Sequence, residues 1–217
     1  MMATTAAGYY GTSVQLSQTL GRISACLARP HFTLLTYLQY LGEIQEWTNF
    51  VPDTVKITTN STPMQIRAAN FLSLRRLDAI IIATRPFLGG LVQFGEAEIP
   101  ERYRKCFKYF ANIASLAARE SLALLRNLGE EGQVKGLTAF DKHFLVQDAT
   151  VLALSSVILQ GKRDERIRFR ECIEMLLRLP GGRFGYLIRD MRGVEATLER
   201  FAKEKAPVGP YLLPISH

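Results

Sequence analysis

The sequence predicts an all-α fold, as a single helical domain of about seven amphipathic helices. Apolar side chains recur at three- and four-residue spacing through most of the chain, and no segment of useful length alternates apolar and polar residues as a half-buried strand would. Proline and glycine residues separate these periodic segments. With 217 residues and 47% hydrophobic content, the chain is long and apolar enough to bury a core.

The first two helices are expected between residues 14 and 49. Residues 1–13 are interpreted as a flexible arm, followed by a helix over 14–28. A second helix over 32–49 should end where Pro52 restricts the backbone before it. The polar run 58–63 is then a surface loop. The residues that the second helix should bury are Leu34, Leu38, Leu41 and Trp47.

The third helix, residues 64–85, is the most hydrophobic, which predicts a central position. The ring of Pro86 disfavours helical geometry at Arg85, so the helix should end there. Gly89 and Gly90 would then lie in the connection to the next helix. They are interpreted as a turn and not as a phosphate-binding loop, because no strand precedes them.

A fourth helix should begin beside Pro100, which suits a first helical turn because it has no N–H to leave unpaired. Residues 103–128 follow a helical apolar repeat, and Gly129 and Gly132 should end the helix. The opposite, polar face is expected to consist of Lys105, Lys108, Asn112, Ser115 and Arg119.

Three further helices are expected over residues 138–161, 163–179 and 184–205. Residues 206–217 contain three prolines and should form an extended tail, so that 14–205 is the helical domain. The residues that the sixth helix should bury are Phe169, Cys172, Ile173, Leu176 and Leu179.

The charge of the chain is basic but dispersed. The formal net charge is +7, and the excess lies in residues 61–110, with eight basic against four acidic residues, and 161–217, with twelve against eight. Acidic residues mixed into both stretches favour solvated helix faces over the clustered stripe of a nucleic-acid groove. The strongest basic run, residues 162–170 (KRDERIRFR), is interpreted in the same way, as solvated helix surface.

Few residues are suited to catalysis or to metal binding. The three cysteines form no CxxC pair, which excludes a local zinc-cysteine site and favours a reducing compartment. No hydrolase, zinc-protease or nucleotide-binding motif is present. We therefore expect neither an enzyme nor a cofactor. An enzyme with a helical fold is kept as an alternative function, and it would need His143 close to a carboxylate.

No membrane segment is expected. The chain opens without the basic and then apolar residues of a secretory signal. Its longest charge-free apolar stretch, residues 149–160, is shorter than the roughly 18–20 residues of a membrane span.

Asp148 and Arg85 are the candidate site residues. Asp148 lies on the apolar face of the fifth predicted helix, and a buried carboxylate needs a cation or several donors. Arg85, at the expected end of the third helix, is the partner that we expect, either in an internal ion pair or in a ligand site.

Three ordered segments carry a family resemblance. Residues 44–55 (IQEWTNFVPDTV) close a helix with Val-Pro, residues 72–88 (LSLRRLDAIIIATRPFL) end in Arg-Pro-Phe-Leu, and residues 103–128 place a cysteine before small and apolar residues. Together they resemble the regulatory, or middle-homology, region of fungal-specific transcription factors, over roughly residues 15–201. The motif residues, with a structural role by this resemblance, are Trp47, Pro52, Arg85, Pro86 and Cys106.

The resemblance implies the C-terminal portion of an all-helical regulatory domain that controls transcription in a fungal nucleus. The family's six-cysteine binuclear zinc cluster is absent from the sequence, so no zinc is expected, and DNA would be reached only through a missing N-terminal module. The expected partners are proteins of the transcription machinery or a second copy of the chain, and regulation could equally act through an effector. The alternative is an all-α small-molecule sensor without DNA-binding activity of its own, with its site near Arg85 and Asp148.

Overall fold

A computed structural model gives the fold, and it describes residues 2–27, 34–49, 51, 56–130, 141–159, 163–179, 189–194 and 196–197. Within these residues all regular structure is helical and no strand occurs, which confirms the all-α prediction. Residues 189–194 and 196–197 are helical and lie in the range predicted for the seventh helix. The six longer helices are α1 (Met2–Leu27), α2 (Leu34–Asn49), α3 (Pro63–Glu98), α4 (Glu101–Glu130), α5 (Asp141–Ile158) and α6 (Arg163–Arg178).

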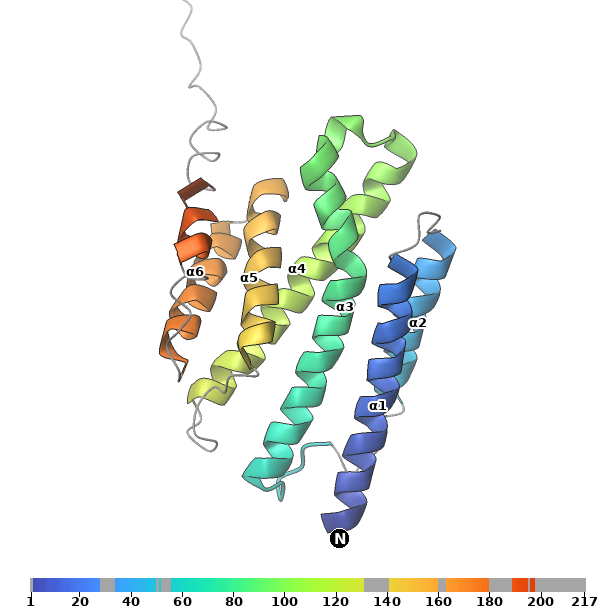
Figure 1. Cartoon of the computed structure of the whole chain (residues 1–217), viewed down its shortest axis with the longest axis vertical. Helices are drawn as coiled ribbons and strands as arrows, with labels where there is room; N and C mark the ends of the chain where they lie inside the picture. The colour runs from blue at the N-terminus through green and yellow to red at the C-terminus, as the bar shows by residue number, and fades with distance from the viewer. Residues whose placement is uncertain are drawn as a thin grey trace, which may run out of the picture.

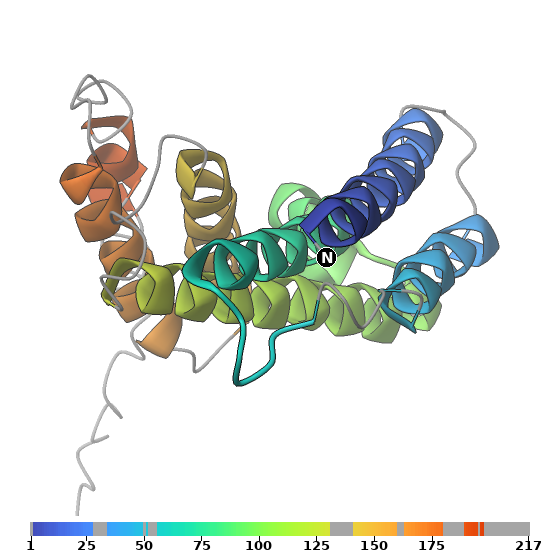
Figure 2. The same cartoon turned by 90° about the horizontal axis from the view of Figure 1, so that it is seen from below.

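The two longest helices, α3 and α4, form the centre of the bundle (Figure 1). Helices α1 and α2 lie on one side of this pair, and α5 and α6 lie on the other. Seen end-on, the α1–α2 pair and the α5–α6 pair are well separated along the central pair (Figure 2). The buried apolar residues accordingly form two clusters, both of which include residues of α3 and α4.

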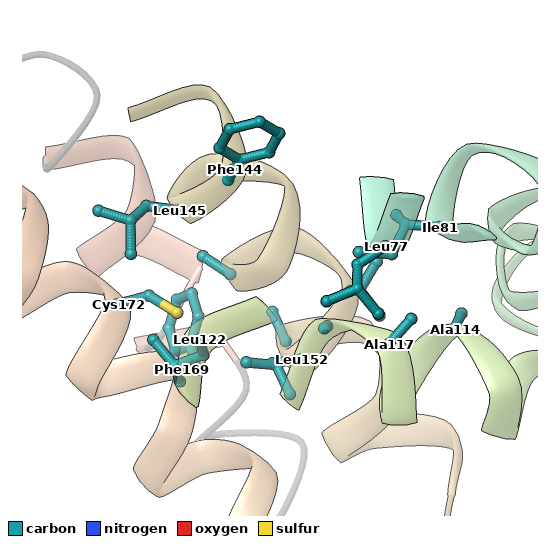
Figure 3. Packing of buried hydrophobic residues seen from close by; sticks show 14 of the residues in the cluster. Leu77, Ile81, Ala114, Ala117, Leu122, Phe144, Leu145, Leu152, Phe169 and Cys172 are labelled. Carbon is teal, nitrogen blue, oxygen red and sulfur yellow. The ribbon is translucent and has the colours of Figure 1, made fainter. Parts of the chain in front are cut away.

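The larger cluster joins α3, α4, α5 and α6 (Figure 3). Leu77 and Ile81 of α3 approach small residues of α4, where Ala114 and Ala117 allow the two helices to pack closely. The five residues that the sixth helix was expected to bury are all buried, which confirms its periodicity.

The smaller cluster joins α1, α2, α3 and α4 around three aromatic rings in edge-to-face and tilted contact. The ring centroid of Tyr37 lies 4.7 Å from that of Phe87 and 5.0 Å from that of Phe110. The burial predicted for α2 is wrong at Leu38, which is 50% exposed, whereas Trp47 is buried as predicted. The buried stripe of α2 is set by Tyr37, whose hydroxyl donates to the Ala83 carbonyl of α3.

The predicted end of the third helix at Arg85 is wrong, because α3 continues through Pro86 to Glu98. A proline inside a helix lacks one backbone hydrogen bond and costs about 3 kcal/mol. Phe87, Leu88 and Leu91 are buried immediately after it, and burying each such side chain contributes about 1.5–3 kcal/mol. Tertiary packing therefore outweighs the local penalty.

The connection between α3 and α4 is Ile99 and Pro100, after a kink of α3 at Gly95, and not Gly89 and Gly90, which are helical. Gly95 has φ of 71°, a left-handed value that favours glycine, and helical geometry is interrupted there. Ile99 ends the element, and Arg104 donates to its carbonyl at 3.1 Å, while Pro100 precedes α4 as predicted.

The N-terminal helix begins earlier than predicted, so the flexible arm over residues 1–13 is wrong for residues 2–13. Glycines at positions 8 and 11 lower the local helix propensity, but tertiary contacts compensate for it. Thr12 is buried, and its carbonyl accepts a hydrogen bond from the indole Nε1 of Trp47 at 2.9 Å.

The loop before α3 is confirmed as exposed, with a turn between Thr58 and Ser61. The helix starts at Pro63 and not at residue 64, because Thr62 and Gln65 form a capping box. The predicted breaks at Pro30, Pro52 and Gly132, the predicted start at Thr138 and the tail 206–217 lie outside the described residues.

By length and composition, α3 is the one helix among the described residues that could cross a membrane. Half of its most apolar stretch is buried inside the bundle. A core helix has the same profile, and α3 packs against α1, α2, α4 and α5.

Candidate functional site

An open pocket of about 300 Å³ lies between the end of α2, the segment that follows it and the first half of α3. Figure 1 shows the lower ends of α2 and of α3, which contribute most of the lining residues. We call this pocket the Trp47 pocket. It is lined by Trp47, Thr48, Val51, Lys56, Ile57, Ala69, Leu72, Ser73 and Arg76.

The neutral polar groups of the Trp47 pocket already donate to backbone carbonyls. The indole of Trp47 donates to Thr12, as described above. The Thr48 hydroxyl donates to the Ile44 carbonyl at 3.1 Å, and the Ser73 hydroxyl donates to the Ala69 carbonyl at 3.1 Å. Within the described residues, the charged lining residues are Lys56 and Arg76, and none of the lining residues is acidic.

Of the residues that the family resemblance singles out, Trp47 is the one that lines this pocket. Pro86 and Arg85 are exposed on α3, away from the pocket lining. Cys106 is partly buried against the smaller cluster, where burial raises the pKa of its thiol. Pro52 lies outside the described residues.

The predicted ion pair between Arg85 and Asp148 is wrong. Arg85 is exposed, and its guanidinium donates to the Gln147 side chain at 2.9 Å. Asp148 is 1% exposed, and neither of its carboxylate oxygens accepts a hydrogen bond of ordinary geometry. Gln147, the partner of Arg85, and Asp148 lie on different faces of α5, because consecutive residues of a helix point about 100° apart.

Asp148 lies among polar groups of the core instead. Burial raises the pKa of Asp148 well above its ordinary range, the hydroxyl of Ser121 opposes this, and the charge of Asp78 adds to it. Ser121 is thus close enough to act on the carboxyl, although its contact lacks ordinary hydrogen-bond geometry. Burial raises the pKa of the Cys172 thiol, and the charge of an ionised Asp148 raises it further. A protonated Asp148 fits this surrounding best.

His143 contacts a carboxylate. Its Nε2 lies 3.3 Å from Oδ2 of Asp78, and burial raises the pKa of Asp78 although the imidazole opposes it. The His143 side chain is 57% exposed. The contact gives His143 the carboxylate neighbour that a general base needs, so the alternative of a helical enzyme keeps its candidate.

The buried ion pairs lie at positions that the sequence analysis did not select. Asp141, with no exposed side-chain surface, accepts hydrogen bonds from Arg67 at 2.6 and 2.7 Å, which joins α5 to α3. The burial of Asp141 could have been predicted from its spacing, because residues 141, 144, 145 and 148 form one helical stripe that is buried throughout.

A second buried carboxylate, Glu165, joins α6 to α4. It accepts hydrogen bonds from Arg119 at 2.5 Å and from Ser115 at 2.8 Å. Glu165 has no exposed surface, so the solvated interpretation of the run 162–170 is wrong at this residue, and the polar outer face predicted for Ser115 and Arg119 is wrong as well. The signal was available, because Glu165 precedes Phe169 by four residues on the buried face.

No group of three or more His, Cys, Asp or Glu side chains that could hold a metal ion occurs in the described part of the chain. The fold and the site define a helical bundle with an open, cation-bearing pocket at one end. Comparisons with protein-family models, with curated proteins and with solved structures find no match to the chain. The resemblance to fungal transcription factors therefore stays a prediction.

Proposed function

We propose that the chain is a regulatory domain of a fungal transcription factor-like protein, and that it controls transcription in the nucleus by binding an effector or a partner. The observation that carries the proposal is the Trp47 pocket. It is built around the tryptophan of the first family-like segment, and it combines an apolar lining with two cations. Small-molecule sites have this construction, with volumes that start near 300 Å³.

The position of the pocket supports a regulatory role. Its walls come from α2, from the segment after it and from α3, so an occupant would fix these three parts relative to one another. Helix α3 also contributes to both core clusters. A ligand that binds one arrangement of the α2–α3 contact more tightly than another shifts the population of the whole bundle.

The second candidate function is an all-α small-molecule sensor without a DNA-binding module. The Trp47 pocket supports the sensor as well as it supports the regulatory domain. The ligand site of the sensor would then lie at Trp47 and not, as expected from the sequence, near Arg85 and Asp148. The two functions differ in context, because only the first requires the bundle to act on transcription when it is brought to a promoter.

The test is a reporter assay in which the full chain is joined to a heterologous DNA-binding domain. The variant Ala69→Phe fills the pocket without removing a charge or a hydrogen-bonding group. The matched control is Ala123→Phe, the same change on the exposed face of α4. We expect the wild-type chain to change reporter output, Ala69→Phe to alter that effect, and Ala123→Phe to behave like the wild type.

A wild-type chain that leaves reporter output unchanged would contradict the transcriptional proposal. Equal effects of the two Phe variants would contradict the role of the pocket. The thermal stability of each purified variant, measured in parallel, separates loss of the fold from loss of the site.

A further inference from the structure

We propose that the Trp47 pocket binds a small organic carboxylate, with its acid group at Arg76 and its apolar body against Trp47. This inference rests on the proposed function, because it names the chemical class of the effector. It follows from the charges, the hydrogen bonds and the size of the pocket.

The charges of the lining favour an anion. Lys56 and Arg76 are both cationic, and none of the lining residues that the structure describes is acidic. The Arg76 side chain is 27% exposed, and its guanidinium lies 3.9 Å from the carboxylate of Glu120, whose side chain is 65% exposed. Such a long and solvated pair holds the guanidinium weakly, so an acid group in the pocket can replace Glu120 as its partner.

The hydrogen bonds of the lining select against a neutral polar head group. The indole of Trp47 and the hydroxyls of Thr48 and Ser73 already donate to backbone carbonyls. A neutral ligand would therefore find few unused donors on the neutral lining residues. A carboxylate can instead accept charge-assisted hydrogen bonds from the planar guanidinium of Arg76.

The other lining residues are mostly apolar, so the part of the ligand beyond its acid group should be apolar too. Val51, Ile57, Ala69 and Leu72 contribute aliphatic surface, and Trp47 contributes an aromatic ring. A volume of about 300 Å³ lies at the lower end of small-molecule sites and suits a single ring or a short chain. The ligand class is thus a monocarboxylate with a compact apolar body.

The chain reports on this site by itself, because Trp47 is its only tryptophan. Intrinsic fluorescence of the full chain is titrated with 3-phenylpropionate and hexanoate, and with the corresponding neutral amides, which have nearly the same shape. We expect each carboxylate to bind about 10- to 100-fold more tightly than its amide, as expected for one charge-assisted contact. Inorganic phosphate, an anion without an apolar body, should leave the fluorescence unchanged.

Two neighbouring arginines provide matched variants. Arg76→Gln removes the guanidinium from the pocket and should reduce the preference for carboxylate over amide to less than about threefold. Arg75→Gln makes the same change one residue earlier, where the guanidinium donates to Ser17 of α1 at 2.9 Å, and should keep the preference. Glu120→Gln removes the competing acid and should tighten carboxylate binding.

Equal affinity for carboxylate and amide, or an equal loss in the two arginine variants, would overturn the inference. So would the absence of any fluorescence change with both acids up to about 10 mM, which corresponds to negligible affinity. A reporter that responds to Ala69→Phe while the acids fail to bind would leave the proposed function standing and refute only the ligand class. Carboxylate binding with no reporter response would do the opposite.

Discussion

Replacing Gly90 by alanine should destabilise the protein, whereas the same change at Gly89 should stabilise it. Both residues lie inside α3, so both substitutions gain the usual preference of a helix for alanine over glycine. They differ in surroundings. A Cβ atom at Gly90 would lie 2.7 Å from Cε1 of Phe107 on α4, whereas a Cβ atom at Gly89 has nothing within 4 Å.

The magnitudes follow from this contrast. The helix preference is worth about 0.5–1 kcal/mol in each variant. Overpacking at Gly90 costs about 1–3 kcal/mol, since the Phe107 ring also packs against Phe87 at 5.1 Å and cannot move freely. Because the helix term is common to both variants, Gly90→Ala should be less stable than Gly89→Ala by about 1–3 kcal/mol.

The assay is urea denaturation of the two variants and the wild type, followed by far-UV circular dichroism. Adding Phe107→Leu to Gly90→Ala should restore part of the lost stability, and a double-mutant cycle measures that coupling. An equal gain in stability at both positions would contradict the close approach of Gly90 to Phe107. A loss at both positions would refute a continuous α3 and would favour the turn that the sequence predicts at Gly89 and Gly90.

Four further substitutions test polar groups and ion pairs of the bundle by urea denaturation. Burial raises the pKa of Asp148 in the folded state above its unfolded value. The contribution of Asp148 to stability is therefore complete below the unfolded-state pKa and is lost as pH rises through the folded-state pKa. Asp148→Asn should raise the stability at pH 7 and should remove most of this loss with pH. Arg119→Ala removes the guanidinium that binds the buried Glu165 and should cost about 3–5 kcal/mol. Arg126→Ala breaks the more exposed ion pair of Arg126 with Glu171, which also joins α4 to α6, and should cost far less. Tyr37→Phe keeps the edge-to-face ring contacts but loses the hydrogen bond to the Ala83 carbonyl, which should cost about 1 kcal/mol. An unchanged pH profile in Asp148→Asn, equal losses in the arginine variants or a neutral Tyr37→Phe would contradict these assignments.

Periodicity alone was sufficient where one helix face meets one partner. The stripe of α6 that contains Phe169 and Cys172 is buried as the spacing predicts. In α2, the same reasoning selected Leu38, which is exposed, because a tyrosine with a bonding partner on α3 determines which face turns inward. The spacing of apolar residues predicts that a helix has a buried face, but the contacts with the neighbouring helix determine which residues form that face.

The local rules for proline and glycine failed at the centre of the bundle. The sequence predicts a break at Pro86, yet the burial of Phe87 and Leu88 carries the helix onward. The contribution of that burial depends on residues of α4 and of the other helices, which no window around Pro86 contains. Long-range packing is the information that a local pattern lacks.

The candidate site was also only partly accessible from the sequence. The rule that a buried carboxylate needs a cation holds for Asp141 and Glu165, and it fails for Asp148, to which it was applied. Trp47 was identified as a core and motif residue. Its pocket could not be anticipated, because the pocket forms only when α2, the following segment and α3 come together.

The central claim is that this bundle regulates by being occupied at the Trp47 pocket. The most direct test is the output of the promoter-tethered reporter with Arg76→Gln, Arg75→Gln and Ala69→Phe compared side by side. We predict that Arg76→Gln changes the output in the same direction as Ala69→Phe, and that Arg75→Gln matches the wild type. Folded Arg76→Gln and Ala69→Phe variants that both match the wild type would contradict the claim.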